Sequence, residues 1–508
     1  MNQVLIDGES LSLQNVHNLV HEGYEAAIAP EARERMQQTR QTVEGAIASG
    51  HIVYGVNTGF GKLSSVVIPH EQIEELQRNL VLSHACGVGD PIPTPIVRTA
   101  LVLKANSLCK GYSGVRPIVA ELVVELFNRN VTPIIPCKGS VGASGDLAPL
   151  AHLTLVLMGL GEALIDGARL SGGEALQRVG LQPLKLQAKE GLALLNGTQI
   201  TAAYAVEALT RAVQLSKIAD IAGAMSTESL LGTNTAFDER IHRARGHKEQ
   251  IQVAANLRAL MADSEIVASH RTCSKVQDAY SSRCIPQVHG AVRQALRYVQ
   301  EVVETELNAC TDNPLVFSKE GEILSGGNFH AQPLSLACDV LSIAVSQLAN
   351  ISERRLENLM DPVQSGLPAF LTRHGGLHSG LMIAQVTAAA LVSENKVLSH
   401  PASVDSIPTS ANQEDFVSMG THSARKALEI VENAETVLAV ELLAACQALD
   451  LRGTLKPGIG SEAAHRIIRR SIPTLDEDRL IQTDIQTLLK LIRNGDLLHA
   501  VEAAVGPM

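Results

Sequence analysis

The chain has 508 residues, of which 45% are hydrophobic and 19% charged, which provides for a large buried core and excludes an intrinsically disordered protein. Its 42 Lys and Arg residues stand against 53 Asp and Glu, a net charge of -11, so we expect no basic face for nucleic acid or an anionic membrane. Only 3% of residues are aromatic and Trp is absent, which argues against the stacking platforms of single-strand nucleic-acid binders.

The N-terminal region carries Asp7 and Glu9 and has no basic segment followed by an apolar run, so we expect no signal peptide. The 8 cysteines are widely spread, and no two of them form a C-x-x-C pair. We therefore expect reduced thiols and a cytoplasmic protein.

Helices dominate the expected secondary structure. One helix is predicted with Thr94 as its N-cap before Pro95, and it should end before Gly111. The longest apolar stretch, Leu147 to Leu164, is interrupted by Gly159 and therefore predicts a buried core helix rather than a membrane span.

Strands are expected to be few. Asp166-Gly167 predicts a short hairpin, and a second hairpin is expected around Lys319 to Glu322. Three long segments lack internal Pro and are rich in Ala, Leu and Val, which predicts long bundle helices. These segments are 199–225, 334–360 and 424–451.

The string from Gly139 to His152 is the most informative part of the sequence. It reads as a Gly-rich turn entering a helix, and an arbitrary turn of this composition is more often structural. Its triplet Ala143-Ser144-Gly145, however, has the residues that backbone cyclisation requires. The Gly145 nitrogen can approach the Ala143 carbonyl without a Cβ in the way, and Ser144 has a hydroxyl to lose as water. The product would be an electrophilic methylidene-imidazolone.

This string resembles the signature of the aromatic amino-acid ammonia-lyase family, whose members form this prosthetic group autocatalytically from Ala-Ser-Gly. Further segments resemble other blocks of the family in the same order along nearly the whole chain. They are His51–Gly61, Leu195–Thr198, Gln277–Cys284 and Gly326–His330.

The resemblance implies a mainly α fold, a long-helix bundle of the fumarase/ammonia-lyase type with minor β-hairpins. An N-terminal region over 1–200 would carry the triplet and a lid loop, and an elongated helical bundle with C-terminal helices would occupy 201–508. The resemblance also implies a homotetramer with active sites shared between subunits.

The Gly-rich segment after Tyr54 is not a nucleotide-binding loop, because Leu63 follows Lys62 where a P-loop needs Ser or Thr. A flexible loop suits a lid that brings the Tyr54 phenol to a substrate, although a tyrosine that merely fixes a turn is the alternative. By resemblance, Tyr54 removes the substrate β-proton.

Asn196 precedes the helix expected near Gln199, where an amide and free N–H groups could meet an anion together, or simply cap the helix. The resemblance places Asn196 at the prosthetic-group and substrate site. Arg283 is the candidate for a forked contact with the substrate carboxylate. The remaining residues that the resemblance assigns to the catalytic and substrate-binding site are Gln277, Tyr280 and Phe329.

The Ser83-His84 pair resembles the histidine-specific members of the family, although a lone His is more often structural. Glu414 adds a carboxylate that could hold an imidazole N–H or the substrate ammonium. Three residues depart from the pattern of those members and bear on fine substrate preference. They are Phe416, Ser282 and Gln332.

We therefore expect an enzyme that eliminates ammonia from L-histidine to give trans-urocanate. His374 and His378 stand four residues apart, but the glycines between them disfavour a metal-binding helix, so neither a metal nor a nucleotide cofactor is expected. The alternative within the family is a lyase or 2,3-aminomutase acting on tyrosine or phenylalanine. A fumarase-like lyase would need a Gly-Ser-Ser loop followed by Met-Pro-x-Lys, which the sequence lacks, and a helical scaffold would leave the triplet and Arg283 unexplained.

Overall fold

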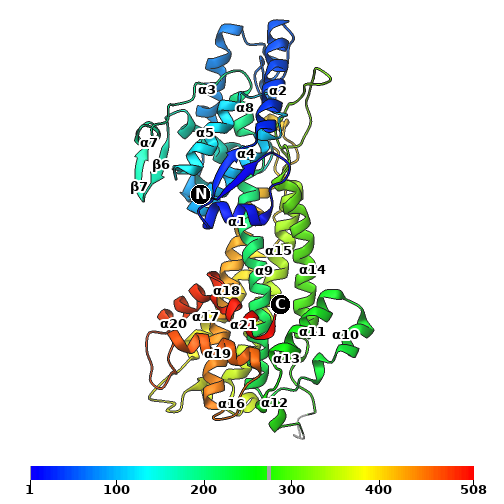
Figure 1. The fold of residues 1–508 in the computed structure, drawn as a ribbon, viewed down its shortest axis with the longest axis vertical. Coiled ribbons are helices and arrows are strands. Elements are labelled where there is room, and N and C mark those ends of the chain that lie inside the picture. The colour runs from blue at the N-terminus through cyan, green and yellow to red at the C-terminus, as the bar shows by residue number, and fades with distance from the viewer. Residues whose placement is uncertain (1, 272–275) are drawn as a thin grey trace. The chain divides into compact units, whose positions relative to one another are not determined.

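The computed structural model describes residues 2–271 and 276–508 (Figure 1), so the predicted free thiol of Cys273 lies outside the described residues. No cysteine among the described residues takes part in a disulfide. Contacts divide the chain into two compact units. The first unit comprises Met1–Glu207, Gln300–Asp339 and Pro401–Arg425, and the second comprises Ala208–Val299, Val340–His400 and Lys426–Met508. The first unit thus includes the region predicted over 1–200 and also takes in two later segments.

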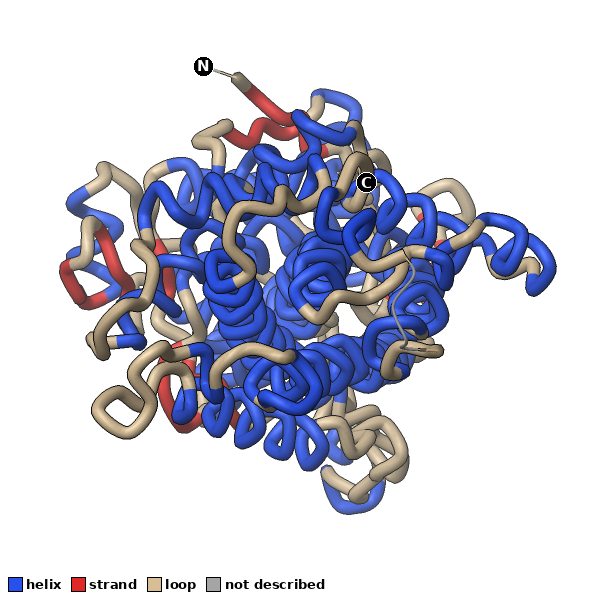
Figure 2. The backbone as a smooth tube through the Cα atoms, turned by 90° about the horizontal axis from the view of Figure 1, so that it is seen from below, coloured by secondary structure: helices blue, strands red, loops and turns tan. Residues whose placement is uncertain are grey.

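Four of the five boundaries between the units fall inside long helices, and the fifth, between His400 and Pro401, lies in the loop after α17 (Met382–Leu398). Three of these helices, α9 (Gln199–Ser229), α15 (Gln332–Met360) and α18 (Gly420–Leu451), confirm the long helices predicted from sequence. The fourth, α14 (Ile285–Leu307), was not predicted, because its apolar residues form a single stripe between charged residues rather than a continuous Ala- and Leu-rich run. Figure 2 shows the dominance of helices and the shortness of the strands.

α18 is buried over most of its circumference, with Val437, Leu438, Val440 and Leu442 all inaccessible. Its wide apolar face is therefore enclosed. Within the described part of the chain, α15 is the one helix long and apolar enough to cross a membrane by length and composition, and 67% of its most apolar stretch is buried in the protein, as in a core helix.

The first unit contains short sheets. Both predicted hairpins are present, with Ile165 paired to Ala168 in the first and Phe317 paired to Glu322 in the second. The pairs are β1 (Gln3–Ile6) parallel to β2 (Glu25–Ile28), β3 (Val88–Pro91) with β5 (Pro136–Lys138), β4 (Thr132–Pro133) with β6 (Glu162–Ile165), β6 with β7 (Ala168–Ser171), and β8 (Leu315–Phe317) with β9 (Glu322–Leu324).

The first unit also contains shorter helices. They are α1 (Leu13–His21), α2 (Pro30–Ala48), α3 (Ile73–His84), α4 (Thr94–Cys109), α5 (Pro117–Asn128), α6 (Leu147–Leu157), α7 (Gly172–Arg178) and α8 (Glu190–Leu195). α4 was predicted, but Pro93 rather than Thr94 is its N-cap, because Thr94 already adopts the helical conformation. α6 is the predicted buried helix, although it ends at Leu157 and the rest of the apolar stretch continues into β6.

The shorter helices of the second unit complete the chain. They are α10 (Glu239–Arg245), α11 (Lys248–Leu260), α12 (Glu265–Ser269), α13 (Tyr280–Arg283), α16 (Pro362–Ser365), α17 (Met382–Leu398), α19 (Ile459–Ser471), α20 (Ile481–Arg493) and α21 (Asp496–Val505).

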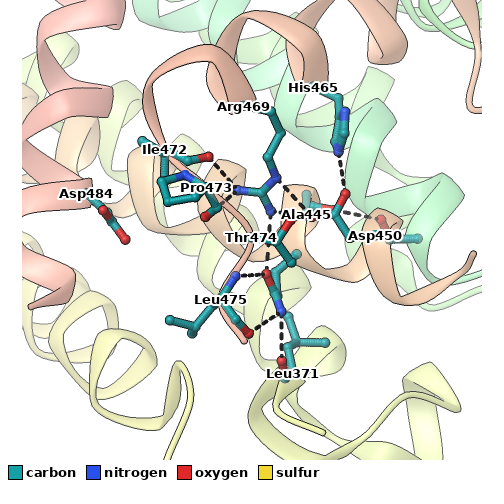
Figure 3. A network of polar contacts seen from close by, with 12 residues as sticks. Leu371, Ala445, Asp450, His465, Arg469, Ile472, Pro473, Thr474, Leu475 and Asp484 are labelled. Carbon is teal, nitrogen blue, oxygen red and sulfur yellow. Dashed lines mark hydrogen bonds and ion pairs between the residues drawn. The ribbon is translucent and has the colours of Figure 1, made fainter. Parts of the chain in front are cut away.

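A polar network joins the end of α18 to α19 and to the loop that follows it (Figure 3). The Asp450 carboxylate accepts hydrogen bonds from His465 Nε2 at 2.7 Å, Arg469 Nε at 2.9 Å and Thr474 Oγ1 at 3.0 Å. One carboxylate therefore holds three separate parts of the second unit.

Candidate functional site

The Ala143-Ser144-Gly145 triplet lies in the turn between β5 and α6, as the sequence predicts. Gly145 has φ +75°, and a Cβ on it would lie 2.1 Å from the Gly197 carbonyl oxygen. The same oxygen accepts a 2.7 Å hydrogen bond from the Asp146 amide. Only glycine fits this close approach, so the turn is held directly against the segment that precedes α9.

The Asp146 carboxylate anchors the turn to neighbouring helices. Its fully buried carboxylate accepts hydrogen bonds from the Thr201 amide at 2.8 Å, the Thr201 hydroxyl at 2.8 Å and the Thr421 hydroxyl at 2.6 Å. Burial raises the pKa of Asp146, while these hydrogen bonds lower it in opposition. Because the Thr201 amide belongs to the first turn of α9, the carboxylate ties the triplet to the start of that helix.

A cavity of about 390 Å³ opens beside the triplet, within the first unit. It contains six of the residues that the sequence assigns to the site, and they come from loops far apart in the chain. These are Tyr54, Ala143, Ser144, Asn196, Phe329 and Glu414. The rest of its wall consists of Gly61, Ser64, Asn313, Ser325, His330, Gln413, Asp415 and Phe416.

Polar groups from separate segments of the chain line this cavity. The Ser144 hydroxyl donates to Glu414 Oε1 at 3.2 Å, and the other oxygen of Glu414 accepts from the Thr409 hydroxyl at 2.7 Å. The Tyr54 hydroxyl accepts from the Gly61 amide at 3.3 Å, which holds the phenol to its own Gly-rich loop. A hydroxyl, a phenol and a carboxylate are thus available to one small molecule.

Asn196 is 4% exposed, and its amide nitrogen donates to the Asn313 carbonyl at 2.9 Å. Sequence reasoning missed Asn313, whose only signal is the polar turn-forming run Asp312-Asn313-Pro314 before β8. His330 was also missed as a residue of the cavity wall, and its ring stacks on Phe416 with centroids 6.0 Å apart.

His84 ends α3 and does not line the cavity. Its Nδ1 is 2.8 Å from the Leu80 carbonyl, so the ring is held to its own helix. Burial lowers the pKa of His84, and the hydrogen bond to Leu80 and the charge of Glu414 oppose that effect. The charge of Glu414 therefore reaches the imidazole, although the structure does not place the ring in the cavity wall.

The remaining predicted residues belong to the second unit. Tyr280 and Arg283 lie on α13, with the Arg283 guanidinium 4.5 Å from the centroid of the Tyr280 ring, and Gln277 lies in the preceding loop. The α13 turn is held by the buried Arg355, which donates to the Ser281 carbonyl at 3.2 Å. Tyr280 is 70% exposed.

The departures from the family pattern occupy different settings. Phe416 is 61% exposed in the cavity wall. Ser282 is buried within α13. Gln332 begins α15 and donates to the Ser403 carbonyl at 3.4 Å. Among these three, Phe416 is therefore the one in direct reach of a ligand in the cavity.

The surroundings of the triplet fit the predicted ring. The Ser418 hydroxyl donates to the Gly142 carbonyl at 3.0 Å, the Met419 amide donates to the Val141 carbonyl at 2.8 Å, and Gly145 packs on Gly197 where no side chain fits. The turn is thus held on both sides while Ser144 faces the cavity. In residues 2–271 and 276–508, no three His, Cys, Asp or Glu side chains are grouped so that they could hold a metal ion.

Comparison with known proteins extends over the whole chain. Residues 11–470 match the family described as aromatic amino acid lyase. The chain is 55% identical to a histidine ammonia-lyase of Anaeromyxobacter sp. (strain K) over 506 residues, 98% of this chain and 100% of that protein. The crystal structure of histidine ammonia-lyase from Trypanosoma cruzi has a TM-score of 0.92 and 45% identity, covering 99% of this chain and 96% of that one. Tyrosine aminomutase from Streptomyces globisporus has a TM-score of 0.94 and 36% identity, covering 100% and 99%.

Proposed function

The chain belongs to the aromatic amino acid lyase family and is a carbon–nitrogen lyase, and we propose that it eliminates ammonia from L-histidine to give trans-urocanate. The observation that carries the proposal is the contact between Ser144 and Glu414, which sets the cyclisable triplet beside a carboxylate suited to a basic ring. The test is a panel of L-histidine, L-phenylalanine and L-tyrosine, followed by the ultraviolet absorbance of each unsaturated acid. Turnover of either other amino acid in preference to histidine would refute it.

The proposed prosthetic group is 4-methylidene-imidazol-5-one, formed from Ala143-Ser144-Gly145. A bond forms between the Gly145 nitrogen and the Ala143 carbonyl carbon. The carbonyl oxygen leaves as water with the amide hydrogens of Gly145 and Ser144, so a C=N bond forms to the Ser144 nitrogen. Ser144 then loses its Cα hydrogen and its hydroxyl as a second water. The group supplies an electrophile to the substrate. Its formation should lower the intact mass by about 36 Da.

The other residues bind the substrate and move its protons. Arg283 would take the carboxylate in a forked contact, with Tyr280 and Gln277 beside it. Tyr54 would remove the β-proton, and Asn196 and Phe329 would position the reacting end of the substrate. Glu414, supported by His84, would hold the imidazole or the ammonium.

We also propose a cytoplasmic homotetramer in which several subunits build each active site. Tyr54 belongs to the first unit and Arg283 to the second. In the proposed tetramer, the Tyr54 and the Arg283 of one active site come from different subunits. A monomer in light-scattering measurements would refute the assembly.

A second candidate function is a lyase or 2,3-aminomutase acting on tyrosine or phenylalanine. The exposed Phe416 ring in the cavity wall favours it, because an aromatic face suits a phenyl or phenol ring. The same substrate panel distinguishes the two, since an aminomutase would release a β-amino acid, which chromatography of the products detects.

A further inference from the structure

A buried lysine lies behind Asn196. Lys104, on α4, is 1% exposed, and its ammonium donates to the Asn196 carbonyl at 2.6 Å and to the Ala193 carbonyl at 3.2 Å. A lysine inside a core is costly to bury, and a well-packed apolar residue would usually be as stable or more so. Its presence on the inner side of the cavity wall therefore calls for a role beyond packing.

The backbone of Asn196 and Gly197 links this lysine to the triplet. Lys104 holds the Asn196 carbonyl, and the next carbonyl, that of Gly197, accepts from the Asp146 amide at 2.7 Å and lies against Gly145. A shift of the Asn196 peptide would move the surface on which Gly145 rests. The lysine is thus one peptide unit away from the turn that must cyclise.

A buried ion pair lies near Lys104 and acts on its charge. Lys189 and Asp312 form a buried ion pair with a 2.6 Å separation, and the Asn196 amide nitrogen is 3.5 Å from Asp312. Burial lowers the pKa of Lys104 to about 8, and the negative charge of Asp312 is the largest effect that opposes this shift. Two backbone carbonyls accept hydrogen bonds from this nitrogen and Asp312 opposes the effect of burial, so the surroundings favour the charged form, whose hydrogen bonds are the stronger ones.

We propose that Lys104 is a positioning residue for formation of the prosthetic group: it holds Asn196 and Gly197 against Gly145, so that the Gly145 nitrogen stays within reach of the Ala143 carbonyl carbon. Lys104 adds no atom to the ring and exchanges no proton with it. The inference rests on the proposed function in one respect, namely that the triplet cyclises.

The test follows ring formation by intact mass at intervals after cell-free synthesis is stopped. Lys104→Met keeps the length of the side chain and removes the donor. We expect ring formation to slow about tenfold or more, because a charged hydrogen bond to the Asn196 carbonyl is lost. Lys104→Gln, which keeps an amide donor, should fall between Lys104→Met and the wild type, and it serves if Lys104→Met does not fold.

The matched control is Asn106→Leu on the same helix. Asn106 is as deeply buried, and its amide holds the Leu307 carbonyl and the Gly8 amide, neither of which touches the triplet. It should lower the thermal unfolding temperature as Lys104→Met does while forming the ring at the wild-type rate. If Lys104→Met and Asn106→Leu slow ring formation equally, Lys104 acts only through stability, and the proposal is overturned.

The outcomes separate this inference from the proposed function. If the wild-type chain shows no loss of about 36 Da, the prosthetic group does not form, and the proposed role of Lys104 is refuted as well. If the wild type cyclises and both Lys104 variants cyclise at the same rate as the wild type, only the assignment of Lys104 is overturned.

Discussion

The Ser144 hydroxyl lies 3.2 Å from a carboxylate oxygen of Glu414, although 270 residues separate the two in the chain. The second oxygen of Glu414 is held by the Thr409 hydroxyl at 2.7 Å, so the carboxylate has a defined orientation. If the Cβ of Ser144 becomes the methylene carbon of the proposed group, this carboxylate lies beside the electrophilic carbon that a substrate would attack. Glu414 is therefore suited to act on the bound substrate.

The first prediction is that Glu414→Gln lowers kcat for L-histidine by roughly a hundred- to a thousandfold, because the amide keeps the shape of the side chain and removes its negative charge. Ring formation should persist, with the intact mass still about 36 Da low. Asp415→Asn is the control, since Asp415 lies in the same cavity wall and should have the smaller effect. Equal losses in the two variants would contradict the role of Glu414.

The second prediction concerns Tyr54→Phe, which removes only the hydroxyl. Loss of a general base costs about a hundred- to ten-thousandfold in rate, so kcat should fall by that order. The variant also loses the contact with the Gly61 amide, a cost of about 1 kcal/mol in stability, and should remain folded. Steady-state absorbance assays and thermal unfolding measure the two effects. Nearly full activity would exclude the phenol from proton removal.

Local motifs predicted the parts of the site that depend on backbone chemistry. The triplet turn, the start of α9 after Asn196 and both hairpins follow from Gly, Asp and capping residues, whose conformational preferences act over a few positions. The meeting of Ser144 with Glu414 has no local signal, because it depends on how distant loops pack. Family resemblance pointed to Glu414, whereas the only sequence signal at Asn313 is the turn-forming run Asp312-Asn313-Pro314, which does not indicate a site.

Buried charge was the other part that sequence reasoning missed. Lys104 stands in an apolar helical segment, where a lysine usually lies at the surface or extends to solvent. Its burial depends on carbonyls that α8 and the following loop present, and these are not adjacent in sequence. The helix α14 was missed for a different reason, since its single apolar stripe needs a helical-period analysis to be seen.

The third prediction tests substrate preference. Replacing Ser83-His84 with Phe-Leu removes a polar partner for imidazole and adds apolar surface, so the ratio of kcat/KM for phenylalanine to that for histidine should rise roughly ten- to a thousandfold. Arg283→Lys is the comparison, because it acts on the shared carboxylate and should weaken all substrates alike. If the ratio stays constant in the double replacement, Phe416 becomes the next residue to test.

The fourth prediction uses complementation. A chain with Tyr54→Phe and a chain with Arg283→Ala should each be inactive, and mixing them under subunit exchange should restore part of the activity. Recovery requires Tyr54 and Arg283 of one site to come from different subunits, so that some hybrid sites contain both intact residues. No recovery despite proven exchange would place the two residues in the same subunit.

The last prediction concerns the polar network of Figure 3 and acid stability. Burial raises the pKa of Asp450, but the hydrogen bonds from His465 and Thr474 and the charge of Arg469 outweigh it, so the pKa lies below its usual 3.8. A folded-state pKa below the unfolded one stabilises the protein above the unfolded value, and this stabilisation is lost as pH falls through the folded value. Asp450→Asn should therefore cost about 1–3 kcal/mol at pH 7 and progressively less as the pH falls below 3.8.

Chemical unfolding of Asp450→Asn and the wild type across this pH range gives the measurement. Asp476→Asn is the control, because Asp476 is exposed in the loop after α19 and should change stability little at any pH. A destabilisation by Asp450→Asn that stays constant down to strongly acidic pH would mean that the carboxylate acts through its shape and not through its charge. The link between α18 and α19 would then rest on packing around Asp450 rather than on its ion pair with Arg469.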